Sequence, residues 1–208
     1  MPEPAEFPAT LEIDYPDREL DRVTTFFRPL LVIPIAIILG LLTGSAARHE
    51  GSATYWCGSG GILFVATALM LVFRRKYPGW WFDWNFELVN FSTRVLAYLA
   101  LLRDEYPSTD DEQAVHLALA YPDAERELNR WLPLVKWFLA IPHYIVLWFL
   151  SLAAALCVIV AWFAILFTGR YPRGLFEFVV GVLRWWLRVV AYAFLLTTDR
   201  YPPFSLER

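Results

Sequence analysis

Charged and apolar residues occupy separate blocks along this chain of 208 residues. The segments 29–42 and 61–73 contain no charged residue, and neither does the run from Trp137 to Gly169. A helix that crosses a membrane needs about 20 mostly apolar residues; the last run, extended back to Trp131, is about twice that length. We therefore expect a turn near Ser151. The pattern predicts four membrane-spanning helices, at about 26–43, 57–74, 131–150 and 152–169.

The segments that flank these helices show two other periodicities of apolar and polar residues. TLEIDYP (10–16) and VHLALAYP (115–122) alternate apolar and polar residues, as a half-buried strand does. In segments 80–102 and 174–196, polar or small residues recur at intervals of four, three, four and four. This spacing places them in one narrow stripe on a helix, with Trp, Phe, Leu and Val around the rest. Such a helix is typical of the membrane interface. The alternative is a third, tilted span whose stripe faces a partner helix.

These elements occur twice in the same order. YPDRELDR (15–22) returns as YPDAERELNR (121–130), and Pro34 matches Pro142, where each proline is expected to kink its helix. The sequence predicts an all-α membrane protein made of an N-terminal tail (1–8) and two tandem parallel repeats, 9–112 and 113–208. Each repeat has a short cytoplasmic strand, a helical hairpin and an amphipathic interfacial helix. An approximate twofold axis along the membrane normal would let the two strands pair, antiparallel.

Proline follows six of the ten tyrosines. Proline disfavours helical geometry in the residue before it and can begin the next helix, so each Tyr-Pro pair predicts a corner. Tyrosine also favours the membrane interface, where its ring is in apolar surroundings and its hydroxyl reaches headgroups. We therefore interpret all six as interfacial anchors: Tyr15, Tyr77, Tyr106, Tyr121, Tyr171 and Tyr201.

The distribution of Lys and Arg predicts an orientation. Seventeen of the 18 lie outside the hairpin loops, and only Arg48 lies within one. Because Lys and Arg mark the cytoplasmic side, we expect a multi-pass protein of the cell's inner (plasma) membrane with both termini in the cytoplasm.

The composition limits the candidate chemistry. The chain is 58% hydrophobic and carries a net charge of −3, so nothing supports nucleic-acid binding. It contains no catalytic or nucleotide-binding motif, and Cys57 and Cys157 are too few for a zinc site. We expect no cofactor, no metal and no enzymatic activity. The apolar middles of the predicted spans contain no charge, which disfavours an ion pathway. His143 is expected to make a polar contact between helices rather than relay protons.

The stripes and the adjacent corners form the candidate lipid site, because the planar guanidinium of arginine can donate two hydrogen bonds to a phosphate. The candidate residues are Asp83, Arg94 and Tyr98 in the first repeat and Arg170, Arg173, Glu177, Arg184, Arg188 and Tyr192 in the second. The alternative is that the stripes pair with each other or face water.

The segment FTGRYPRGLFEFVVGVLRWWLRVVAYAFLLTTDRYPPFSL (167–206) resembles a bacterial integral-membrane family known as domain of unknown function number four-three-eight-nine. Two tandem copies would cover nearly the whole chain, although FRRKYP (73–78) departs from FTGRYP (167–172). The resemblance implies a small membrane protein and no established activity.

The sequence therefore predicts a structural or accessory protein that binds lipids, anionic ones in particular, and that joins a larger membrane complex or a second copy of itself. A small transporter or channel with a cavity between the repeats is the alternative, and a membrane-embedded enzyme is the third candidate.

The orientation can be tested with two engineered cysteines in a chain that lacks Cys57 and Cys157. In intact cells, a thiol reagent that cannot cross membranes should modify a cysteine at Ser45 but not one at Ser108, because only the hairpin loops face outward. Modification at Ser108 alone would reverse the predicted orientation.

Overall fold

The computed structural model describes residues 7–16, 19–42, 59–109, 111 and 113–207. Arg48, Cys57 and most of the first hairpin loop lie outside these residues. The chain is mostly helical, and two helices, Arg22–Leu42 and Ile141–Thr168, are long and apolar enough to cross a membrane. Their ends are not where the apolar blocks alone placed them, because the corners between elements also depend on proline and on side-chain caps.

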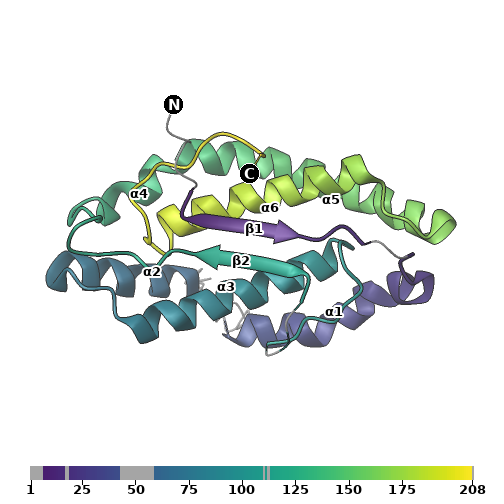
Figure 1. Cartoon of the computed structure of the whole chain (residues 1–208), viewed down its shortest axis with the longest axis horizontal. Coiled ribbons are helices and arrows are strands. Elements are labelled where there is room, and N and C mark those ends of the chain that lie inside the picture. The colour runs from purple at the N-terminus through teal and green to yellow at the C-terminus, as the bar shows by residue number, and fades with distance from the viewer. Residues whose placement is uncertain (1–6, 17–18, 43–58, 110, 112, 208) are drawn as a thin grey trace, which may run out of the picture.

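The elements follow one another in two similar series. The first is β1 (Ala9–Ile13), α1 (Arg22–Leu42), α2 (Ser59–Leu69) with its π-helical extension η1 (Met70–Arg74), and α3 (Gly79–Leu99). The second is β2 (Val115–Leu119), α4 (Pro133–Leu139), α5 (Ile141–Thr168) and α6 (Arg173–Ala193). Figure 1 shows the helices and both strands running roughly along the long axis of the molecule, with the strands at its centre.

The two strands pair antiparallel, as the sequence predicted. Leu11 lies opposite Leu117 in the register, and each of these leucines stands four residues before the tyrosine of its Tyr-Pro pair. Ala9, Leu11 and Ile13 of β1 are buried against α6 and the main core, whereas Glu12 and its partner His116 are exposed. The sheet therefore has one apolar face and one polar face.

The predicted helical hairpin of the second half is wrong. Ser151 lies inside α5, which continues unbroken for 28 residues, and the interruption falls at Ala140 instead. Pro142 explains the position of this break, because a proline cannot donate the backbone hydrogen bond that would join the two helical segments. Pro34, in contrast, lies within the continuous helix α1. The second half therefore holds one long apolar helix rather than two short ones.

Neither amphipathic helix lies free on the surface. Helix α6 packs between β1 and α5, and most of its side chains are buried, including several from the apolar part and Arg188 and Tyr192 from the polar stripe. A Cβ atom at Gly181 would lie 3.0 Å from the backbone of Leu206 in the C-terminal tail. Most of the stripe of α6 thus faces β1 and the C-terminal tail, while Glu177 near its start is exposed.

Two corners use left-handed backbone geometry at equivalent places. Arg75 (φ 49°) and Gly169 (φ 73°) each end a helix two residues before a tyrosine of a Tyr-Pro pair. Their amides donate to the carbonyl oxygens of Leu71 and Ile165, which closes the last helical turn. The next helices begin directly after Pro78 and Pro172, as expected for corner prolines.

Opposite stability changes should follow from substitutions at these two corners. Gly169→Ala should lower the free energy of unfolding by about 1–2 kcal/mol, because a side chain disfavours left-handed geometry. The Glu19 carboxylate, 3.2 Å from the new Cβ, adds crowding. Arg75→Gly should raise the free energy of unfolding by up to about 1 kcal/mol, because glycine adopts left-handed geometry without this cost. Denaturant unfolding in detergent measures both; changes of the same sign would contradict this account.

Candidate membrane-facing site

Helix α5 presents an uninterrupted apolar face. Its exposed large side chains recur at helical spacing from one end to the other: Ile145, Trp148, Phe149, Leu152, Leu156, Ile159, Val160, Phe163 and Phe167. Phe167 is 79% exposed, and the whole helix contains no charged residue. A water-soluble monomer rarely exposes an apolar patch this long, and patches of this kind mark membrane or protein contacts.

Helix α1 presents a second face of the same kind. The exposed side chains are Val23, Phe26, Phe27, Leu30, Leu31, Ile33, Ile37, Ile38, Leu41 and Leu42. The two helices are in contact, because the indole nitrogen of Trp162 donates a 3.1 Å hydrogen bond to the carbonyl oxygen of Thr25. Phe26 also stacks against Trp162, with ring centroids 6.1 Å apart.

Three arginines of the predicted lipid site are bound to the protein's own backbone. Arg184 donates to the carbonyl oxygen of Leu11 (2.8 Å) and Arg94 to that of Ser108 (2.7 Å). Arg188, which is 4% exposed, donates to the carbonyl oxygens of Ser205 and Glu207. Burial, and then the charge of Arg184, lowers the pKa of Arg188, but an arginine remains protonated at neutral pH. The arginines of these stripes therefore bind β1 and the segments that follow α3 and α6.

Other predicted lipid-site residues remain on the surface. Asp83 and Glu177 are exposed. Arg170 is 76% exposed, with its guanidinium 3.8 Å from the Glu19 carboxylate. The guanidinium of Arg173 lies 5.1 Å from the centre of the Tyr15 ring. The corner at Tyr171 thus carries two exposed arginines.

The stripe tyrosines, Tyr98 and Tyr192, support two buried cations that sequence reasoning missed. Arg28 is 1% exposed and lies 4.5 Å above the ring of Tyr98, where it donates to the carbonyl oxygen of Arg103 (2.9 Å) and pairs with Asp104. A guanidinium over an aromatic face is stabilised by the ring quadrupole, and the carboxylate offsets its desolvation.

Lys136 makes the same set of contacts in the second half. It is fully buried 5.2 Å from the ring of Tyr192, donates to the carbonyl oxygen of Thr198 (2.7 Å) and pairs with Asp199 (2.6 Å). We call these two sets of contacts the cation clamps. Lys136 stands six residues before Pro142, just as Arg28 stands six before Pro34. This matched spacing was the signal in the sequence that could have found them.

Each clamp also holds the start of a helical segment. The second carboxylate oxygen of Asp104 accepts from the amide of Asp21 (2.9 Å), and that of Asp199 accepts from the amide of Asn129 (2.6 Å). Asp21 in turn accepts from the amide of Val23, as a helix-capping residue does. One carboxylate therefore ties the end of each half to the start of its first helix.

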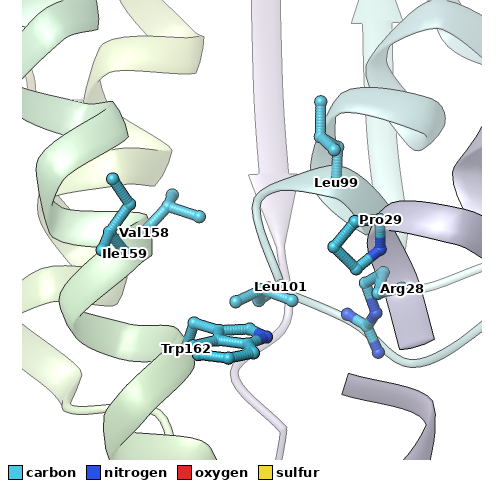
Figure 2. A pocket seen from close by; sticks show the side chains of 7 residues that line it. All are labelled: Arg28, Pro29, Leu99, Leu101, Val158, Ile159 and Trp162. Atoms are coloured by element: carbon cyan, nitrogen blue, oxygen red, sulfur yellow. The ribbon is translucent and has the colours of Figure 1, made fainter. Parts of the chain in front are cut away.

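A small cavity of about 210 Å³ lies beside the first clamp. Figure 2 shows it between Pro29 on α1, Leu101 after α3, and three side chains of α5, Val158, Ile159 and Trp162. Its volume is below the range of about 300–1,000 Å³ that is usual for ligand pockets. We interpret it as a packing void between the two apolar helices.

The six Tyr-Pro tyrosines differ in how far they are buried. Tyr77 and Tyr171 are buried, and burial raises the pKa of both hydroxyls. Tyr15 and Tyr121 donate to the carbonyl oxygens of Tyr171 and Tyr77, so each corner of one half receives a hydrogen bond from the other half. The rings of Tyr106, Tyr121 and Tyr201 are exposed, and Tyr15 is half-buried.

His143 makes the contact between helices that the sequence suggested. It is fully buried, and its Nδ1 accepts a 3.1 Å hydrogen bond from the indole of Trp185 on α6. Within the described ranges, no cluster of three or more His, Cys, Asp and Glu side chains could hold a metal ion.

Comparison with known proteins gives one match. Residues 131–205 match the family described as a domain of unknown function (DUF4389). The matched stretch runs from just before α4 into the C-terminal tail, and it agrees with the resemblance seen in the sequence for one copy. A comparison with curated proteins finds no match, and neither does a comparison with solved structures.

Removal of one buried cation should destabilise the protein far more than removal of an exposed one. Lys136→Met should lower the free energy of unfolding by about 3 kcal/mol, because Asp199 and the Thr198 carbonyl lose their partner. Arg170→Met is the control, and we expect a change below about 1 kcal/mol because its ion pair is exposed. Unfolding in detergent measures both variants. Equal effects would show that the clamp contributes nothing special.

Proposed function

We propose that this protein is a non-enzymatic scaffold that sits in the lipid bilayer and binds lipid. The observation that carries the proposal is the pair of exposed apolar faces on α1 and α5, on which the one exposed charge is Arg22 at the start of α1. Exposure of apolar faces of this extent to water is unfavourable, whereas contact with the hydrocarbon of a bilayer is not. The same faces would also suit a larger membrane complex or a second copy of the chain.

The polar face of the sheet supports an orientation for these helices. Glu12 and His116 are exposed register partners in the two strands. The strands lie at the centre of the molecule and run along the same long axis as α5 (Figure 1). If α5 crossed the bilayer, this polar pair would lie at the depth of the hydrocarbon, where exposed charge and open sheet edges are strongly disfavoured. We therefore propose that α1 and α5 lie along the cytoplasmic leaflet and that the sheet faces the cytoplasm.

This orientation changes the result expected from the two engineered cysteines. A protein embedded in the cytoplasmic leaflet exposes neither Ser45 nor Ser108 to an external reagent, and both termini remain cytoplasmic. Modification at Ser45 alone would favour the multi-pass arrangement predicted from the sequence.

A tandem duplication is the second part of the proposal. The pairing of Leu11 with Leu117, the two cation clamps and the reciprocal hydrogen bonds of Tyr15 and Tyr121 are what an approximate twofold axis through the sheet would produce. If the sheet faces the cytoplasm, this axis lies along the membrane normal.

The clamps also bear on the choice between a scaffold and a transporter. A buried charge in a membrane protein is by default a candidate for an ion pathway. Arg28 and Lys136, however, are both occupied by a carboxylate, a backbone carbonyl and an aromatic ring. These contacts support a structural role, and therefore a scaffold.

Binding of anionic lipid should depend on the arginines of the Tyr171 corner, Arg170 and Arg173. We expect the protein purified in mild detergent to retain anionic phospholipid, detected by native mass spectrometry, and the double variant Arg170→Gln, Arg173→Gln to retain several-fold less, since each juxtamembrane cation contributes about 1 kcal/mol. The matched control, Arg170→Lys with Arg173→Lys, keeps the charge and should retain most of the lipid. Unchanged retention in the glutamine variant would remove these residues from the site.

A further inference from the structure

A cavity larger than the one beside Arg28 lies between the two halves of the chain. Its volume is about 540 Å³, and its walls come from α3 of the first half and from α5 and α6 of the second. This volume is within the range of about 300–1,000 Å³ that is usual for ligand pockets. Most of its walls are aliphatic or aromatic; the polar members are Asn85, Ser92, Tyr144 and Ser151.

The cavity is closed at one side and bordered by membrane-facing residues at another. Val89 and Val190 are buried in the same core cluster as Leu11 and Val115 of the sheet, so this side of the cavity ends against the protein interior. Trp148, in contrast, is 64% exposed and belongs to the apolar face of α5. The cavity is thus continuous with the surface that we place in lipid.

One wall carries a buried polar group without a partner. The hydroxyl of Tyr144 is buried and has no hydrogen-bond partner among the described residues. Its ring lies 6.2 Å from that of Phe194, which also lines the cavity. Buried hydroxyls are normally hydrogen-bonded, so Tyr144 is an exception in the wall of this cavity.

We propose that this cavity holds one acyl chain of a phospholipid from the surrounding bilayer. This inference rests on the proposed function, because it requires α5 to lie in lipid. The apolar walls match the chain, and the continuity with the α5 face gives it an entry from the bilayer. A chain from the bilayer fits this entry better than a soluble ligand does, since a soluble ligand would have to arrive through lipid.

A lipid that reacts on illumination tests the proposal. The full chain is reconstituted in nanodiscs with a phosphatidylcholine that carries a diazirine midway along one acyl chain, and the labelled residues are identified by mass spectrometry. We expect labelling both on the outer face of α5, around Leu156, and inside the cavity, at Leu88 and Val89 of α3. Ser92→Trp, which fills the cavity, should reduce labelling of α3 by about tenfold. Labelling around Leu156 should not change.

Matched variants separate a filled cavity from a misfolded protein. Leu156→Trp places the same side chain on the outer face and should leave labelling of α3 unchanged, whereas Ser92→Phe gives a smaller blocking group if Ser92→Trp fails to fold. Labelling on the outer face of α5 but not on α3 would overturn the cavity proposal and leave the proposed function intact. Labelling of α3 that persists in both Ser92 variants would also overturn it. Labelling of neither helix would contradict the proposed function itself.

Discussion

Each half of this protein is organised around one buried positive charge. Burying a cation is unfavourable unless hydrogen bonds and an opposite charge replace its water. Arg28 and Lys136 obtain these from backbone carbonyls and carboxylates at the end of the same half, and each also lies over a tyrosine ring. The helix that carries each cation, α1 or α4, is therefore fixed only when the chain after α3 or α6 has returned to meet it.

This arrangement leaves the apolar helices with one free side. α5 packs mainly on α6 and also contacts α1 through Trp162, while a long apolar face of α5 stays exposed. Exposed charged residues lie elsewhere, among them Glu12 on the sheet and Arg170 and Arg173 at the Tyr171 corner. In the arrangement that we propose, a molecule divided in this way is oriented toward the bilayer without a helix that crosses it, because each surface matches a different medium.

The periodic segments were predictable, and the ends of the apolar blocks were not. Alternation in TLEIDYP and VHLALAYP identified both strands, and the duplicated order indicated that they would pair. The prediction of a turn at Ser151 was wrong because it was based on the length of the apolar run alone. The missing backbone amide of Pro142 decides where the helix is interrupted. A count of apolar residues cannot distinguish a hairpin from one long helix that lies along a surface.

The candidate site shows the same division. The stripes were recognised from their spacing, but spacing does not say whether a polar side chain meets lipid, water or the chain itself. Arg94, Arg184 and Arg188 bind backbone carbonyls that lie 14 or more positions away in the sequence. Arg28 and Lys136 were overlooked because each is a single charge at the edge of an apolar block, although the duplicated spacing before Pro34 and Pro142 marks both.

The hydrogen bonds that Tyr15 and Tyr121 donate across the two halves have a consequence for biosynthesis. During translation, β1 emerges more than a hundred residues before β2, and the corner carbonyl at Tyr171 that accepts from Tyr15 is made later still. The N-terminal module therefore leaves the ribosome with its strand edge unpaired and its corner unfinished. Contacts between distant segments form slowly, and incomplete sheets tend to aggregate. Early contact of the nascent chain with the proposed membrane, before the second half is complete, would therefore reduce its aggregation.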